Sequence, residues 1–451
     1  MIDRLTRIVA SRFAAPAVII LLGIAWRLLW LARVSPFWER GGESLKASIS
    51  VAQTGLFADA LGRGEGLTAH LNPIMPMIGG VVYWFLGIQT PIANWLLSLS
   101  ALSFSIGSAL LLYRSFGRMG SARGGRLLGL ALYCLLPLSP FTELMEFRHW
   151  EGGLAVLLAT GLLALIVETD AAEVLSWPRR FAIALLAAIL FFINPPLGLA
   201  GYAMVGILLW RKLDRRSYPA TAALAAGLLA AVLAPWAVRN YEAFGRFILV
   251  RGNAGLELAL ANHPAAVSGL DQQAVFKERL REIHPNGNPP VFARMKAMGG
   301  EIPYAAMLGR NTSAWIADHP VQFVRLSVRH LVQFYFPPSW LWRVYGHVGR
   351  GTLVKQMAMW VSAALGLAGT ICAAFIWPHR FKYAAALAFV PALPYIVVQP
   401  ILRYHYLVLG ILLFLTSEIV ARAAHRVRGS GEAATPDALA GVVPTPIGSS
   451  R

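Results

Sequence analysis

The sequence predicts an all-α, polytopic membrane protein of about ten transmembrane helices, joined by extracytoplasmic loops and interfacial helices. Composition is the first indication. Hydrophobic residues make up 57% of the 451 residues and charged residues only 14%, whereas an ordinary soluble domain has roughly 25% charged residues. The second indication is the recurrence of apolar runs of about 20 residues, the length of a helix that crosses a bilayer. We therefore expect a lipid bilayer to surround this chain.

The first element is an apolar run at residues 13–33, which follows Arg4, Arg7 and Arg12. Its length, the internal Arg27 and the lack of an A-x-A cleavage site favour a retained anchor over a signal peptide. Basic residues mark the cytoplasmic side of a membrane. We therefore expect the N-terminus in the cytoplasm and the residues that follow this helix on the extracytoplasmic face.

The next apolar run, residues 73–87, is short and rich in Pro and Gly, which suits an interfacial or re-entrant helix. The later spans are placed so that every basic loop falls in the cytoplasm. They are expected at residues 90–113, 126–142, 151–168, 180–193, 196–210, 219–237, 357–377, 382–398 and 402–421. Both termini are then cytoplasmic. The long stretch before the last three spans is extracytoplasmic, and its apolar part at 321–336 is expected to lie on the membrane.

Four regions follow from this order of elements. Residues 1–238 form an N-terminal transmembrane region, in which 35–90 is the first outer loop. The other regions are an extracytoplasmic cap at 239–356, C-terminal transmembrane helices at 357–428 and a cytoplasmic tail at 429–451. The tail has too little apolar surface to pack and is expected to be disordered. No repeated halves are recognisable, which counts against a secondary transporter.

The net charge of +18 would suggest a nucleic-acid partner in a soluble protein. Here the Arg and Lys residues gather in short loops beside apolar runs, and no basic face is interleaved with aromatic residues. We expect no nucleic-acid binding. Cys134 and Cys372 lie in apolar runs without CxxC spacing, so neither a disulfide framework nor a zinc site is predicted.

Candidate catalytic residues lie in the first outer loop. A carboxylate at Glu43 is suited to act as general base on a hydroxyl or amine, provided that burial or a neighbouring charge sets its pKa. Glu39 lies four residues earlier and would share a helical face with Glu43. The alternative is that both acids are solvated, with Arg40 as a surface partner.

Candidate binding residues lie in two other outer segments and at the start of the last span. Arg403 is suited to hold a phosphate or pyrophosphate through paired hydrogen bonds, and the alternative is snorkelling to the membrane surface. Glu146 and Glu151 belong to a short loop crowded with ionisable residues, which line a cavity or, alternatively, lie in water and headgroups. His70 is expected to cap the interfacial helix, because no second His or carboxylate stands at metal-ligand spacing nearby.

Several segments together resemble bacterial GT-C glycosyltransferases of the protein O-mannosyltransferase and lipid A aminoarabinose transferase type. They are, in order, GGESLKASISVAQTGLFADALG, GLTAHLNPIMPMIGGVVYWFLG, APWAVRNYEAFGRFILVRGNAGLELALANHP and PILRYHYLV. The second contains His70, and the third places Arg239 and Asn240 on the W-x-x-R-N-Y pattern of that family, which makes these three residues candidates for substrate binding. The alternative for Arg239 and Asn240 is a structural role, as a cap and anchor at the top of a span. The resemblance follows the chain in order over nearly its whole length.

The resemblance implies an enzyme of the bacterial inner membrane that takes a sugar from a polyprenyl-phosphate carrier. The acceptor would be a glycan, a lipid or a protein on the extracytoplasmic face. In that scheme Glu43 or Glu39 is the general base, and Arg403 holds the carrier phosphate. Many members have an Asp-Glu pair where this chain has Gly42-Glu43, which leaves the choice of base open. The acids also leave open a divalent cation such as Mg²⁺ or Mn²⁺. The alternative is a non-catalytic or transport protein for lipid-linked sugars in envelope polysaccharide assembly.

Overall fold

The computed structural model describes residues 2–34, 42–138, 140–172, 174–269, 271–344, 349 and 351–432. The candidate base Glu39 and residues 433–451 of the expected tail lie outside the described residues. The described part of the chain is helical and contains no strand. Its last helix continues to Glu432, so the first residues of the expected tail are helical.

In the first half of the chain the helices are α1 (Ile2–Arg33), α2 (Glu43–Thr54), α3 (Ile74–Leu86), α4 (Pro91–Met119), α5 (Arg123–Leu135), α6 (Pro140–Leu144), η1 (Glu146–Arg148), α7 (Gly152–Ala171), α8 (Trp177–Ile193), α9 (Pro195–Lys212), η2 (Arg215–Ser217) and α10 (Tyr218–Phe244). In the second half they are α11 (Ala254–Ala261), α12 (Pro264–Val267), α13 (Gln272–Ile283), α14 (Pro289–Ala297), α15 (Glu301–Asp318), α16 (Pro320–Tyr335), α17 (Ser339–Val344), α18 (Thr352–Phe375), α19 (Phe381–Phe389), η3 (Val390–Ile396) and α20 (Leu402–Glu432).

The all-helical polytopic fold is confirmed. Among the described residues, six helices are long and apolar enough to cross a membrane, namely Ala14–Arg33, Pro91–Met119, Gly152–Ala171, Arg215–Phe244, Thr352–Phe375 and Leu402–Arg426. A bent pair, Arg123–Leu135 with Pro140–Arg148, brings the number to seven if it is counted as one span. Helices occupy the three remaining expected positions, but α8, α9 and α19 with η3 do not meet this test.

Proline explains where the expected spans are shortened or broken. Pro137 and Pro140 interrupt the run that begins as α5, because proline has no N–H to donate, and the two halves meet at 77°. Pro391 and Pro394 likewise convert the end of α19 into the 3₁₀ helix η3. Between α8 and α9, the Asn194 side chain accepts from the Leu197 N–H and caps α9.

The core lies between the long helices, with α20 near its centre. This helix packs against α18 and α5, and two glycines of α18 lie directly against it. A Cβ added at Gly366 or Gly369 would lie 2.9 Å from the backbone oxygen of Leu412 or Leu415, respectively, so only glycine fits. Such small residues let helix backbones approach closely inside a membrane.

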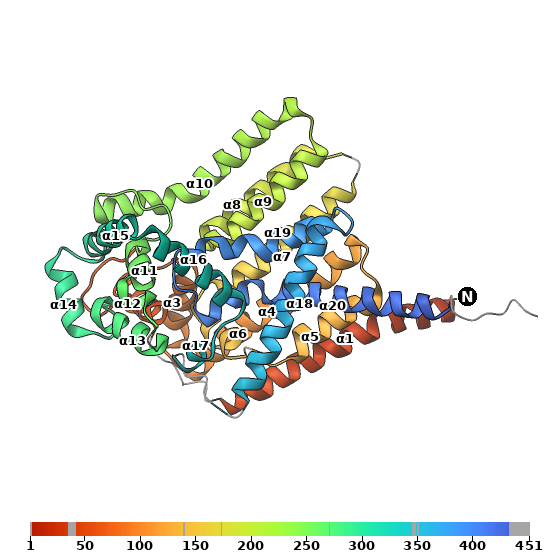
Figure 1. The fold of residues 1–451 in the computed structure, drawn as a ribbon, viewed down its shortest axis with the longest axis horizontal. Coiled ribbons are helices and arrows are strands. Elements are labelled where there is room, and N and C mark those ends of the chain that lie inside the picture. Colours follow the sequence, from red (N-terminus) through yellow and green to blue (C-terminus); the bar gives the residue numbers. More distant parts are fainter. Residues whose placement is uncertain are drawn as a thin grey trace, which may run out of the picture.

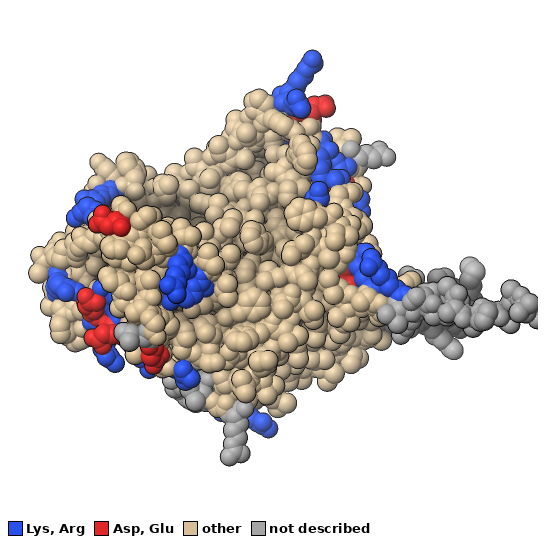
Figure 2. Space-filling view, in the orientation of Figure 1, with Lys and Arg blue, Asp and Glu red and all other residues tan. Residues whose placement is uncertain are grey.

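The short helices gather at one end of the molecule. Figure 1 shows α3 and α11–α17 there, while the beginning of α1 and the end of α20 lie at the opposite end. On the face shown in Figure 2, charged residues concentrate at the ends and edges and leave a broad, mostly uncharged band between them. This arrangement suits a bundle that crosses a bilayer with both described ends of the chain on the same side.

Two shorter helices present apolar side chains to the outside, as expected of helices at a membrane surface. The helix α3 exposes Met77, Ile78, Val81, Trp84 and Phe85. The helix α16 exposes Val321, Val324, Val328 and Val332, while Leu326, His330 and Phe334 are buried. Both helices lie where the sequence predicted interfacial segments.

Candidate active site

The candidate base, Glu43, is the first residue of α2 and follows Gly42, whose backbone is extended. A carboxylate in the first turn of a helix interacts favourably with the unpaired N–H groups at that end. The helix buries Leu45, Ala47 and Ser48 and packs against α3. The start of α2 is thereby fixed in place, and with it the Glu43 side chain.

Two histidines from distant parts of the chain lie against the Glu43 carboxylate. The His70 Nε2 atom is 3.5 Å from Oε2, and the His284 Nε2 atom is 3.4 Å from Oε1. The two imidazole rings meet edge to face, with centroids 6.2 Å apart. His70 precedes α3, and His284 ends α13, so the fold assembles this group from three segments.

The charges in this group are mutually stabilising. Burial alone would raise the pKa of Glu43, but His70, His284 and Arg403 outweigh it and hold that pKa well below its usual range. Burial opposes the charged form of His70, yet Glu43 raises its pKa to about 9. Burial lowers the pKa of His284, which Glu43 only partly offsets. At neutral pH, Glu43 is therefore ionised, His70 protonated and His284 neutral.

The tautomer of His284 follows from its other nitrogen. The Asn286 backbone N–H donates to His284 Nδ1 over 3.2 Å, so in the neutral ring Nε2 carries the hydrogen and faces Glu43. Glu43, His70 and His284 each have a ligand atom within 4.8 Å of the others. Two imidazoles and a carboxylate are ligands that suit Zn²⁺ or Mn²⁺. A cation bound at His284 Nε2 would place the ring hydrogen on Nδ1, and the hydrogen bond from the Asn286 N–H would then be lost.

The expectation that His70 caps the interfacial helix is wrong. The N-cap residue of α3 is Pro73, which makes no side-chain capping bond. The Ile74 N–H donates instead to the Asn72 side-chain oxygen over 3.1 Å. His70 is turned toward Glu43, and its partners come from residues far away in the sequence. The spacing of residues in the sequence therefore could not show that His70 belongs with Glu43 and His284.

Arg403 lies at the start of α20, facing the residues between α6 and α7. Its guanidinium carbon is 5.0 Å from the ring centroid of Trp150, and NH1 is 3.8 Å from Glu146 Oε1. Thr142 donates to the other oxygen of Glu146 over 2.6 Å. Arg403 is thus held by an aromatic face and a rather distant carboxylate, with its side chain 32% exposed.

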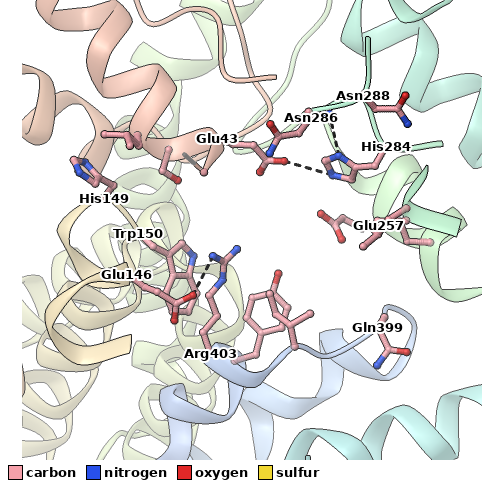
Figure 3. Close-up of a pocket in the computed structure, with 18 of the residues that line it drawn as sticks. Glu43, Glu146, His149, Trp150, Glu257, His284, Asn286, Asn288, Gln399 and Arg403 are labelled. Atoms are coloured by element: carbon pink, nitrogen blue, oxygen red, sulfur yellow. Dashed lines mark hydrogen bonds and ion pairs between the residues drawn. The ribbon is translucent and has the colours of Figure 1, made fainter. Parts of the chain in front are cut away.

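One cavity of about 810 Å³ brings these two groups together. Figure 3 shows Glu43 and His284 on one side and Arg403 with Trp150 on the facing side. Glu257, from α11, points into the same space. Apolar lining comes from Leu45, Phe141, Met145, Trp150, Leu260 and Ile401, and polar lining from Arg281, Asn286, Asn288 and Gln399. The cavity can therefore hold a ligand with a charged, a polar and an apolar part.

Four of the expected binding residues, His70, Glu151, Arg239 and Asn240, do not line this cavity. Glu151 is buried beside it and forms an ion pair with Arg251. Arg239 donates to the backbone oxygens of Thr68 and Phe57 over 2.8 and 2.9 Å. Asn240 accepts from Arg239 and donates to the Ile248 oxygen over 2.8 Å. These contacts brace the segment that carries His70.

Sequence reasoning missed His284, Glu257 and Trp150 as site residues. No motif marks them, because each acquires its role only when separate segments meet at the cavity. The Asn286-Gly287-Asn288-Pro289 run beside His284 indicates a turn, but turns of that kind are common in loops without function. Glu39, the second candidate base, lies outside the described residues.

Comparison with known proteins gives structural relatives only. No protein-family model and no curated protein sequence matches the chain. Among solved structures, the oligosaccharyltransferase AglB from Archaeoglobus fulgidus, in complex with an inhibitory peptide and a dolichol-phosphate, superposes with a TM-score of 0.51 at 14% identity, over 95% of this chain and 52% of that chain. The apo oligosaccharyltransferase of the same archaeon gives a TM-score of 0.51 at 12% identity, over 94% and 52%.

The present chain spans about half the length of these neighbours, 52% of each. At such low sequence identity the likeness concerns the fold. It agrees with the family resemblance of the sequence segments, and it extends over nearly all of this chain. The protein thus has the fold of the GT-C type integral-membrane glycosyltransferases.

Proposed function

We propose that the protein is a membrane glycosyltransferase, which moves a sugar from a polyprenyl-phosphate carrier to an acceptor at the extracytoplasmic face of a bacterial inner membrane. One observation carries the proposal: Glu43 and Arg403 line the same cavity of about 810 Å³. The archaeal neighbour was solved with a dolichol-phosphate, a carrier lipid of the same chemical class.

The Arg403 side of the cavity suits the carrier. A guanidinium can donate two parallel hydrogen bonds to a phosphate, and it is always charged. This charge faces Glu146 across 3.8 Å, a distance at which the pair is loosely held. A carrier phosphate would replace that carboxylate. Phe141, Met145 and Ile401 supply apolar surface beside it for the first part of the polyprenyl chain.

The Glu43 side suits the acceptor. An ionised carboxylate accepts a hydrogen bond from an acceptor O–H or N–H and so orients its lone pair toward the sugar. Because the pKa of Glu43 is low, the carboxylate is a weak base in the ground state. It takes up the proton only as positive charge develops on the attacking atom. A divalent cation held by Glu43, His70 and His284 would supply Lewis-acid activation of the acceptor.

The reaction is an in-line substitution at the anomeric carbon. The acceptor atom forms the new bond to that carbon, while the bond to the phosphate oxygen breaks and its electron pair leaves with the carrier phosphate. The acceptor proton passes to Glu43. Arg403 stabilises the negative charge of the leaving phosphate, and the fixed positions of both substrates lower the entropic part of the barrier.

Transport remains the rival function, and Arg27 is a charged residue inside the first apolar helix. Charged residues inside a transporter usually line its pathway. Here Arg27 is fully buried and forms an ion pair of 2.6 Å with Glu143. It therefore has a structural partner inside the bundle and does not line the described cavity.

The direct test is transfer of radiolabelled sugar from membranes charged with polyprenyl-phosphate sugars. We expect Glu43→Gln to reduce transfer by about 10²-fold or more, the usual size of an acid–base contribution, and to leave polyprenyl-phosphate binding intact. Glu242→Gln, at an exposed carboxylate of α10, is the matched control and should transfer normally. Transfer by Glu43→Gln at the wild-type rate would remove Glu43 from the mechanism, and no transfer from any donor would favour transport.

The cation is tested separately, by thermal unfolding of protein treated with a chelator. Zn²⁺ or Mn²⁺ should raise the unfolding temperature of the wild type, because a ligand that binds only the folded state stabilises it. The Glu43→Gln variant should show no such increase. His379→Ala, which removes a histidine beside the buried carboxylate of Asp170, is the control and should respond like the wild type. An equal response in all three proteins would exclude the site.

A further inference from the structure

A buried polar network lies one helical turn from the cavity, where α1, α5, α6 and α20 meet. Arg27, Glu143 and Tyr406 form its centre, and all three are nearly inaccessible to solvent. The cavity lining includes none of them. Burying a charged pair is costly unless its hydrogen bonds are complete. The hydrogen bonds of these three residues therefore indicate which structural role the network has.

Arg27 completes the broken end of α5. In an unbroken helix the carbonyl of Tyr133 would accept from residue 137, but that residue is proline and has no N–H. The Leu138 N–H bonds to the Leu136 oxygen, which leaves the Cys134 oxygen without its helical partner as well. The Arg27 guanidinium donates to both carbonyls, over 3.2 Å to Tyr133 and 2.5 Å to Cys134, and the Trp26 indole N–H also donates to the Cys134 oxygen over 2.7 Å.

The same guanidinium holds Glu143 through two bonds, 2.6 Å from Nε to Oε2 and 3.0 Å from NH2 to Oε1. The Tyr406 hydroxyl then donates to Glu143 Oε1 over 2.7 Å. Ser105, on α4, lies 3.1 Å from that hydroxyl. The network thus runs from α1 through α6 to α20 without a gap.

Two ties between the same segments follow from these contacts. Tyr406 donates to Glu143. Arg403 lies three residues before Tyr406 on α20, and it faces Glu146, which lies three residues after Glu143 at the start of η1. Residues three apart lie on one face of a helix. The inner tie is short and buried, at 2.7 Å, whereas the outer tie is 3.8 Å and partly exposed. The inner tie therefore fixes the rotation and height of α20, and the outer one adapts to a ligand.

We propose that the Arg27–Glu143–Tyr406 network is a positioning device, which holds the start of α20 so that Arg403 projects into the cavity and can exchange Glu146 for a phosphate. The proposal rests on the function proposed above, because it names what aims the phosphate-binding residue. Tyr406 acts through Arg403 and does not touch the substrate.

The first test is binding of a polyprenyl phosphate without sugar, measured with purified protein in lipid nanodiscs. Tyr406→Phe removes one oxygen atom and should weaken binding by roughly tenfold, the size expected for one hydrogen bond to a charged group. The matched control is Tyr383→Phe. Tyr383 also donates to a buried carboxylate, Asp170, over 3.2 Å, but at the opposite end of the bundle. Wild-type binding by Tyr406→Phe, or an equal loss in both variants, would overturn the proposal.

A double-mutant cycle separates positioning from general stability. When Arg403 is replaced by alanine, there is no guanidinium left to aim, so adding Tyr406→Phe should weaken binding no further. If the two effects multiply instead, Tyr406 acts independently of Arg403 and the positioning role fails. In transfer assays Tyr406→Phe should raise the KM for the carrier-linked sugar more than it lowers kcat.

A measurement without any carrier distinguishes this proposal from the function itself. Hydrogen exchange of the peptides that contain residues 399–408 and 141–150 should be faster in Tyr406→Phe than in the wild type, and unchanged in Tyr383→Phe. If the wild type does not bind polyprenyl phosphate, the proposed function fails while this exchange pattern still supports the network. Unchanged exchange in Tyr406→Phe would exclude the network whatever the substrate.

Discussion

At the scale of single residues, the site depends on charges that stabilise one another. Glu43 remains ionised because His70, His284 and Arg403 lie near it, and His70 remains protonated because Glu43 is ionised. Such a group behaves as a unit, so a change in one member alters the others. The sequence could predict Glu43 and Arg403 from residue type and position. It also named His70 as a candidate, but it predicted neither the contact of His70 with Glu43 nor the role of His284, because the two histidines are separated by more than 200 residues.

The Glu43–His70 pair makes the stability of the folded protein depend on pH. The pKa of His70 is about 9 in the folded protein, above the ordinary histidine value of 6.5. Its stabilising contribution is therefore complete below pH 6.5 and is lost as the pH rises through 9. In chelator-treated protein, the unfolding temperature should fall between pH 7 and pH 9.5.

The variant His70→Gln should lose this part of the pH dependence, which thermal unfolding at a series of pH values would reveal. His319→Gln, at a histidine stacked on Trp315 outside the site, is a suitable control because it should keep the wild-type profile. The same slope in all three proteins would show that the Glu43–His70 pair does not control stability in this range.

At the scale of elements, hydropathy located the helices well and proline decided their ends. The sequence placed α4, α7, α10, α18 and α20 near their observed bounds, because long apolar runs have few alternatives in a bilayer. It expected a single span at 126–142, whereas Pro137 and Pro140 break that run into α5 and α6. The break carries function in our proposal, since it places Glu143 and Glu146 where they face α20.

The short outer helices were less predictable. The sequence indicated interfacial segments at α3 and α16, and both helices expose apolar side chains. It did not indicate how α11 and α13 would bring Glu257 and His284 to the cavity. Such contacts depend on tertiary packing between segments that carry no distinctive pattern of their own.

At the scale of the whole molecule, α11 and α13, which bring Glu257 and His284 to the cavity, lie at one end of the bundle, and the two described ends of the chain lie at the other (Figure 1). We predict that the cavity end faces the extracytoplasmic side. A cysteine at Glu242, exposed near the outer helices, should react with a membrane-impermeant maleimide added to intact cells. A cysteine at exposed Arg216, in η2 between α9 and α10, should react only after the membrane is opened.

The labelling requires a chain without other reactive thiols. Cys134 is fully buried and Cys372 is partly buried, so both are replaced by serine in the background used for labelling. A membrane-permeant maleimide serves as control for accessibility at both positions. The reverse labelling pattern would place the cavity in the cytoplasm and would exclude a carrier sugar presented from outside.

The paired ties between the loop and α20 also constrain how this protein can change in evolution. Arg403 and Tyr406 serve together only because they are three residues apart in one helix, and an inserted residue between them would rotate Tyr406 by about 100° away from Glu143. We therefore expect relatives to lack insertions and deletions in this interval, whereas surface loops elsewhere can vary in length. An R-x-x-Y in the last span, together with an E-x-x-E in an earlier outer loop, is then a joint signature by which relatives of the same mechanism can be recognised when overall sequence similarity has disappeared.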